Sequence, residues 1–171
     1  MKEHNGMRPQ DVVVLLKIAS LGTRRWRGKD LALALGISAS EVSESLNRSA
    51  IAGLLAPDRK SLMHGALLEF LEYGLKYVFP AAPGSLVRGV PTAHSAPPLA
   101  ELMDAGEHLV WPGAAGRVRG QAIKPLYPGV VKAVTRDPLL HEMLALADAL
   151  RAGGARERAL AVKELHRRIH P

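Results

Sequence analysis

The side chains best suited to chemistry in this sequence are hydrogen-bonding and cationic groups between residues 24 and 60. One set falls on a predicted helix over residues 38–52, in which Val42 and Leu46 point inward. The polar side chains left for its outer face are Ser38, Ser40, Ser43, Glu44, Asn47 and Arg48. Hydroxyls, amides and guanidinium groups bond to phosphates or base edges, and a glutamate can accept from cytosine. This face therefore predicts contact with nucleic acid.

Basic residues lie on both sides of this predicted helix. Those before it are Arg24, Arg25, Arg27 and Lys29, and those after it are Arg59 and Lys60. The last two belong to the sequence Pro-Asp-Arg-Lys over residues 57–60, which is typical of a turn and predicts the tip of a short hairpin. The formal net charge of the chain is +7. This balance favours a polyanionic partner, because a cation on a phosphate releases counterions, but it also fits a basic protein without one.

The elements that must position these groups are two helices joined by a tight turn. Gly36 occupies the turn, where a left-handed backbone would strain a residue with a Cβ atom. Ala32 is small enough for a second helix to cross close above it, and Val42 fills the angle between the helices. Ser38 and Glu41 have the spacing of a capping box. Leu31, Leu35, Ile37 and Leu46 complete a small core, so the segment predicts a helix-turn-helix.

The same segment resembles winged-helix bacterial transcription regulators of the MarR type. The resemblance rests on Asp-Leu-Ala-Leu-Ala-Leu-Gly-Ile-Ser-Ala-Ser-Glu-Val-Ser over residues 30–43, Ser-Leu-Asn-Arg over 45–48 and Gly-Leu-Leu over 53–55. It covers roughly residues 9–78. It implies that the helix over 38–52 reads the major groove, that a β-wing with Arg59 and Lys60 touches the minor groove or backbone, and that the protein is a homodimer. Few strand-forming residues follow Lys60, so the expected wing is short.

The remaining chain divides at a proline-rich stretch over residues 80–100, which predicts irregular structure. Hydrophobic periodicity and capping residues predict helices over 9–21, 29–35, 61–78, 99–103, 137–151 and 155–169, and strands over 108–111 and 118–123. The expected fold is mainly α. A winged helix-turn-helix domain over 1–79 precedes a domain over 80–171 with a β-hairpin and a helical hairpin. The second domain would serve dimerisation or bind an effector or partner.

Several chemistries are disfavoured. The chain has no cysteine, which excludes disulfides, thiolate zinc sites and cysteine nucleophiles. Of the seven histidines only His166 and His170 have helical spacing, and they lack the glutamate of a metalloprotease motif. No serine lies in a Gly-x-Ser-x-Gly setting, and residues 113–116 lack the Lys-Ser/Thr ending of a phosphate-binding loop. We therefore expect no catalytic residue, metal or cofactor.

These features predict a sequence-specific regulator that binds double-stranded DNA, most simply a dimeric repressor. An antitoxin or adaptor that binds an operon-encoded protein is the alternative. Arg151, Arg156 and Arg158 ring the expected turn of the helical hairpin, either as a solvated basic turn or as a grip for an acidic partner. The first residues have no apolar secretory segment, and no apolar run approaches the ~20 residues that cross a bilayer. We therefore expect a soluble cytoplasmic protein.

Overall fold

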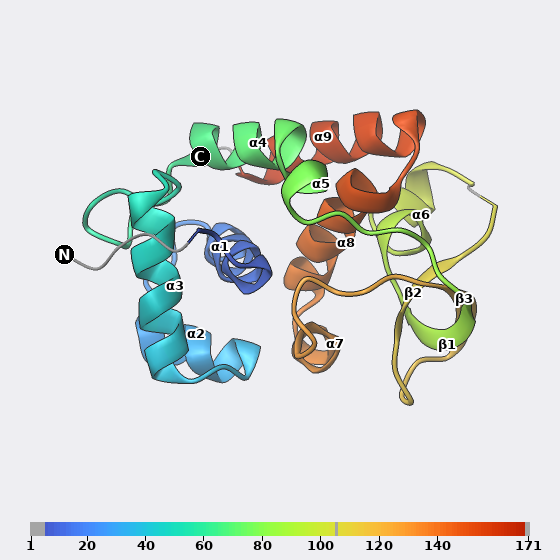
Figure 1. Cartoon of the computed structure of the whole chain (residues 1–171), viewed down its shortest axis with the longest axis horizontal. Coiled ribbons are helices and arrows are strands. Elements are labelled where there is room, and N and C mark those ends of the chain that lie inside the picture. The colour runs from blue at the N-terminus through green and yellow to red at the C-terminus, as the bar shows by residue number, and fades with distance from the viewer. Residues whose placement is uncertain (1–5, 105, 170–171) are drawn as a thin grey trace.

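The computed structural model describes residues 6–104 and 106–169 and shows a mainly helical chain with one small three-stranded sheet (Figure 1). The N-terminal helices are α1 (Pro9–Leu21), α2 (Gly28–Leu35), α3 (Ala39–Ile51), α4 (His64–Tyr73) and α5 (Leu75–Val78). They are followed by β1 (Leu86–Pro91), the 3-10 turn η1 (Ala93–Ser95), α6 (Leu99–Leu102), β2 (Leu109–Pro112) and β3 (Val118–Ala122). The chain then forms α7 (Val130–Ala133), η2 (Val134–Arg136), α8 (Pro138–Ala152) and α9 (Ala155–Ile169).

Helix α1 lies between two layers, with α2 and α3 on one side and α8 on the other (Figure 1). Its residues from Val12 to Leu16 are all completely buried, because both faces of the helix are covered. The same hydrophobic cluster contains Leu67 of α4, Leu144 of α8 and Leu165 of α9. One core therefore passes through both halves of the chain, and the division into domains over 1–79 and 80–171 stays a prediction.

The predicted helix over residues 61–78 is two shorter helices. Residues 61–63 belong to the preceding hairpin, where the Met63 amide donates to the carbonyl oxygen of Leu54 at 3.0 Å. Gly74 separates α4 from α5. Glycine weakens a helix at this point because it has the most backbone freedom to lose. The helical spacing of apolar residues survives the break, since Leu67, Leu71 and Leu75 are all buried.

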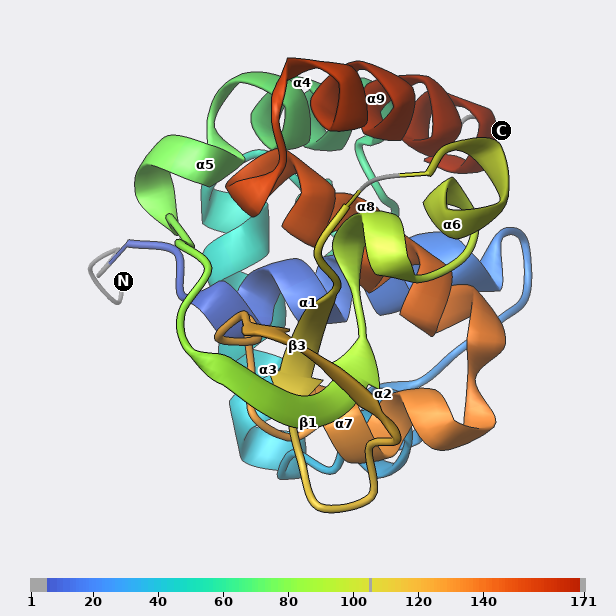
Figure 2. The same cartoon turned by 90° about the vertical axis from the view of Figure 1, so that its right-hand side faces the viewer.

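The proline-rich stretch predicted as irregular contains strand β1. Strand β1 pairs antiparallel with both β2 and β3, and these two pair parallel to each other, so the three strands close on themselves. The predicted hairpin of β2 and β3 is therefore wrong. A Cβ atom on Gly116 would lie 2.1 Å from the carbonyl carbon of Gly89. Glycine permits this close approach. Figure 2 turns the side of the molecule that carries the strands toward the viewer.

A buried polar network fastens the sheet to α8. The Asp148 carboxylate accepts hydrogen bonds from Trp111 Nε1 at 2.6 Å, Thr92 Oγ1 at 2.7 Å and Arg151 Nη1 at 2.7 Å. Arg151 Nε donates in turn to the carbonyl oxygen of Phe79 at 2.8 Å. Burial raises the pKa of the Asp148 carboxyl, and the positive charge of Arg151 opposes that shift. Strand β2, η1 and the chain after α5 are thus held at one point on α8.

The predicted helical hairpin over residues 137–169 is confirmed. The Asp137 side chain caps α8 by accepting from the Leu140 amide at 3.1 Å, and Pro138 follows as the first helical residue. Gly153 and Gly154 separate α8 from α9. Arg151 is not a solvated turn residue, because its guanidinium belongs to the network around Asp148. No helix within residues 6–104 and 106–169 is long and apolar enough to cross a membrane.

Candidate nucleic-acid interface

The turn between α2 and α3 has the backbone geometry that its sequence predicts. Gly36 ends α2 in the left-handed region at φ 65° and ψ 33°, and its amide donates to the carbonyl oxygen of Ala32. The Ile37 amide donates to the same oxygen at 3.1 Å. Val42 of α3 and Leu31 of α2 are completely buried, and the two helices pack against each other. This small core sets the crossing of α2 and α3.

We expect Gly36→Ala to lower the free energy of unfolding by roughly 1–2 kcal/mol, because a Cβ atom is strained in the left-handed region. Urea denaturation of the purified protein measures the change. Gly65→Ala on α4 is the matched control, since Gly65 has no positive φ and open space around its Cβ position. This control should stabilise the protein by about 0.4–1 kcal/mol. Equal effects of the two substitutions would contradict the role of the turn.

The N-terminus of α3 is capped as predicted, but only by half of a capping box. Ser38 Oγ accepts from the Glu41 amide at 3.1 Å. The Glu41 carboxylate turns to α1, where it accepts from Gln10 Nε2 at 2.7 Å and lies 3.9 Å from Arg8 Nη1. Glu41 therefore ties the start of α3 to the start of α1.

Arg48 does not lie on the outer face of α3, and the expectation that it faces outward is wrong. Its side chain is 9% exposed and its Nε and Nη2 donate to the two carboxylate oxygens of Asp11, each at 2.8 Å. Asp11 is completely buried and also accepts from the Arg8 amide at the start of α1. The hydrogen bond to Asp11 raises the pKa of Arg48. An aspartate directly before the apolar run of α1 was the signal for a buried cationic partner.

The other five predicted positions of α3 lie at the surface. Ser38, Ser40 and Ser43 are exposed, and Glu44 and Asn47 are partly exposed. Ser45 and Ser49 face the interior and are completely buried. The first two turns of α3 therefore present small hydroxyl side chains outward, followed by a carboxylate and an amide.

Three separate segments meet beside these turns in a depression that we name the basic groove. It has a volume of about 230 Å³ and is lined by Trp26, Gly28 and Lys29, by Ala39, Val42, Ser43 and Leu46 of α3, and by Asp58, Arg59 and Lys60 of the hairpin. A hollow of about 580 Å³ adjoins it and is lined by Arg25, Trp26, Arg27, Asp30 and Lys60. Trp26 and Lys60 line both. Cations from the link, from α2 and from the hairpin therefore converge on one face.

Five of the six predicted basic residues line the basic groove or its adjoining hollow, and the sixth does not. Arg24 instead donates to the carbonyl oxygens of Leu21 and Ser20 at the end of α1. Arg27 Nε lies 3.5 Å from an oxygen of Asp30, whose pKa is lowered chiefly by the Arg27 amide. Trp26 was not among the predicted site residues, and it is partly buried against the core. A tryptophan between two arginines, in a chain with only two tryptophans, was the available signal.

The predicted hairpin after α3 is confirmed and is very short. Leu55 pairs with Leu62 in a single antiparallel bridge, and the Ala56 amide donates to the carbonyl oxygen of Ser61 at 2.8 Å. The Asp58 carboxylate organises the turn by accepting from the Lys60 and Ser61 amides at 2.8 and 2.9 Å and from Ser61 Oγ. These bonds, the Ser61 hydroxyl first, lower the pKa of Asp58 to about 2. The Asp58 carboxylate therefore stabilises the turn, although only one antiparallel bridge joins its two arms.

We expect the order of this turn to depend on pH with a midpoint near the pKa of Asp58, about 2. The folded pKa is depressed, so the stabilisation is complete above the ordinary value of 3.8 and is lost as the pH falls through about 2. The amide chemical shifts of Lys60 and Ser61 follow this titration by NMR. Asp58→Asn is the control and should abolish it. A midpoint at 3.8 would contradict the carboxylate-centred turn.

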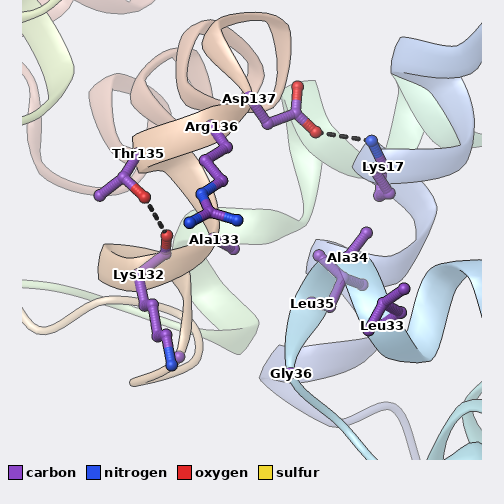
Figure 3. Close-up of a pocket in the computed structure, with 11 residues that line it drawn as sticks. Lys17, Leu33, Ala34, Leu35, Gly36, Lys132, Ala133, Thr135, Arg136 and Asp137 are labelled. Atoms are coloured by element: carbon purple, nitrogen blue, oxygen red, sulfur yellow. Dashed lines mark hydrogen bonds and ion pairs between the residues drawn. The ribbon is translucent and has the colours of Figure 1, made fainter.

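A second depression lies where α2 meets the C-terminal half (Figure 3). It has a volume of about 690 Å³, with the C-terminal end of α2 on one side and the segment from Gly129 to Asp137 on the other. Lys17 Nζ and Asp137 Oδ2 form an ion pair at 2.6 Å at its edge. This ion pair joins α1 to the start of α8.

Within residues 6–104 and 106–169, no three histidine or carboxylate side chains gather in a way that could hold a metal ion. His166 Nε2 lies 3.6 Å from Glu72 Oε2, and His170 is outside the described residues. Comparison of the chain with protein-family models, with curated proteins and with solved structures finds no match. The resemblance to regulators of the MarR type therefore stays a prediction.

Proposed function

We propose that this protein binds double-stranded DNA through a winged helix-turn-helix made of α2, α3 and the hairpin over residues 54–63, and that it regulates transcription as a dimeric repressor. The convergence of five cationic side chains from three segments beside the exposed turns of α3 carries the proposal. Two helices meeting through a tight turn are the docking unit of helix-turn-helix proteins, and a hairpin beside them adds backbone contacts.

The two kinds of side chain have different tasks in this proposal. Arg25, Arg27, Lys29, Arg59 and Lys60 contact phosphates and set the position of the protein on the duplex. Ser40, Ser43 and Asn47 of α3 contact base edges, where an amide pairs with adenine and a hydroxyl is less selective. Arg48 takes no part in base contact, because Asp11 holds it in the interior.

Selection from a random duplex library, followed by fluorescence anisotropy titrations at several salt concentrations, tests the proposal. We expect Lys29→Ala and Lys60→Ala each to weaken binding to selected and scrambled duplexes alike, and to reduce the slope of log K against log salt by about 0.9. Asn47→Ala should instead cost about 1–3 kcal/mol on the selected duplex and spare the scrambled one.

Lys163→Ala is the matched control for these variants, since Lys163 is an exposed cation on α9 outside the basic groove. It should leave the affinity and the salt slope close to those of the unaltered protein. Equal, weak affinity for every duplex would refute sequence-specific recognition. Unchanged salt slopes in both groove variants would refute the basic groove as the phosphate-binding surface.

A further inference from the structure

Two of the few aromatic residues of this chain stand in solvent on adjacent helices. The chain has seven aromatic residues, and Tyr73 and Tyr77 are 68% and 73% exposed. Val78, next to them, is 52% exposed, whereas Trp111 is fully buried. Exposed clusters of large apolar side chains mark interaction sites, and tyrosine is enriched in protein interfaces.

The tyrosines belong to a row of side chains that runs from α4 onto α5. The Gly74 amide donates to the carbonyl oxygen of Phe70 at 2.8 Å, and the amides of Tyr77 and Val78 donate to that of Gly74, so the helical path resumes directly after the break. Glu69, Glu72, Tyr73, Lys76 and Tyr77 occupy positions i, i+3, i+4, i+7 and i+8, which share one face of a helix, and we name this row the tyrosine stripe. The opposite side of the same helices is buried through Leu67, Leu71 and Leu75.

Charge is ordered along the tyrosine stripe. Two glutamates lie at its N-terminal end and one lysine near its C-terminal end, where Lys76 Nζ lies 4.8 Å from the ring centroid of Tyr77. In the part of the chain that the structure describes, Lys76 and Glu69 form no ion pair. Glu72 reaches His166 of α9 instead.

We propose that the tyrosine stripe is the interface of a twofold homodimer. A twofold axis beside Tyr73 pairs the stripe antiparallel with its copy, so that Lys76 meets the Glu69 of the second chain and the tyrosines cover each other. A row that is acidic at one end and basic at the other is complementary to itself only in this antiparallel arrangement, and a twofold interface requires such self-complementarity. The proposal deepens the dimer of the proposed function, and it is tested without DNA.

Light scattering coupled to gel filtration measures the mass of the full chain at micromolar concentration. We expect twice the chain mass of 18.4 kDa for the unaltered protein and a single chain for Tyr77→Glu. Leu33→Glu is the matched control, because Leu33 is an 88% exposed apolar residue on α2, and this variant should stay dimeric. Circular dichroism checks that both variants remain folded.

Charge exchange distinguishes the antiparallel pairing from nonspecific association. Lys76→Glu should weaken the dimer about tenfold or more, since it places glutamates opposite each other. The double variant Glu69→Lys with Lys76→Glu should restore the dimer, because it exchanges the two ends of the stripe. The single variant Lys76→Glu and this double variant also test the interface if Tyr77→Glu does not fold.

A single-chain mass for the unaltered protein would overturn the proposal. The proposal would also be overturned if neither Tyr77→Glu nor Lys76→Glu changed the mass of the dimer, or if the double variant Glu69→Lys with Lys76→Glu did not form the dimer again. A monomeric Tyr77→Glu that still binds one short duplex through the basic groove would support the interface and the proposed function separately. If the unaltered protein is a dimer but binds no DNA, that result would count against the proposed function and leave the dimer interface supported.

Discussion

Arg48→Ala is expected to lower the free energy of unfolding by about 3–5 kcal/mol, because it leaves the buried carboxylate of Asp11 without its cation. Both oxygens of Asp11 accept from Arg48 at 2.8 Å, so the pair is bidentate and has little access to water. Asp11→Ala should lower the free energy of unfolding by a similar amount, since it leaves the buried guanidinium of Arg48 without its carboxylate. Urea denaturation followed by circular dichroism measures both.

Two controls separate the ion pair from a general effect of losing an arginine. Arg24→Ala removes an exposed guanidinium and should change the stability by no more than about 0.5 kcal/mol. The double variant Asp11→Leu with Arg48→Met replaces the buried pair by apolar groups and should recover most of the loss. If Arg48→Ala kept full stability but lost DNA affinity, Arg48 would be a base-reading residue and its burial would be contradicted.

Asp148→Ala is the second substitution with a large expected effect, and it should lower the free energy of unfolding by about 3–5 kcal/mol. It removes the acceptor shared by Trp111, Thr92 and Arg151, all of which point into the interior between the sheet and α8. The Arg151 side chain is only 5% exposed, so its charge would be left desolvated. The near-ultraviolet circular dichroism of Trp111 should weaken at the same time, because the indole loses its hydrogen bond.

Asp104→Ala is the matched control, since Asp104 is an exposed aspartate outside this network, and it should leave both the stability and the near-ultraviolet signal unchanged. A loss below about 1 kcal/mol for Asp148→Ala would contradict the network as the fastening between sheet and α8. Asp148→Asn keeps the shape of the side chain but removes the charge that balances Arg151. Its free energy of unfolding should therefore lie between those of Asp148→Ala and the unaltered protein.

The local geometry of the candidate site could be predicted from the sequence because it depends on short-range rules. A glycine at position 36 permits a left-handed turn, a serine at position 38 caps the following helix, and an aspartate at position 58 organises a tight turn. Each of these interactions joins residues no more than five apart. The basic residues that line the groove could be named for the same reason, since they flank the two helices in the sequence.

The errors concern interactions between distant residues. Arg48 fits the outer face of an isolated α3, but Asp11, 37 residues earlier, draws it inward. The sequence between β2 and β3 predicts a hairpin, but β1, which lies in a proline-rich segment, pairs antiparallel with both strands, and β2 and β3 pair parallel to each other. Trp26 became part of the basic groove only because the link, α3 and the hairpin come together around it.

The sequence by itself therefore determined the helix pair, its turn and cap, and the basic character of its surroundings, since these follow from backbone propensities and charge within short segments. Only the tertiary structure decided which polar side chains of α3 are buried, how the strands of the sheet pair and which cations share one groove. Such features depend on contacts whose energies are set by burial, and burial is a property of the packed chain rather than of any one segment.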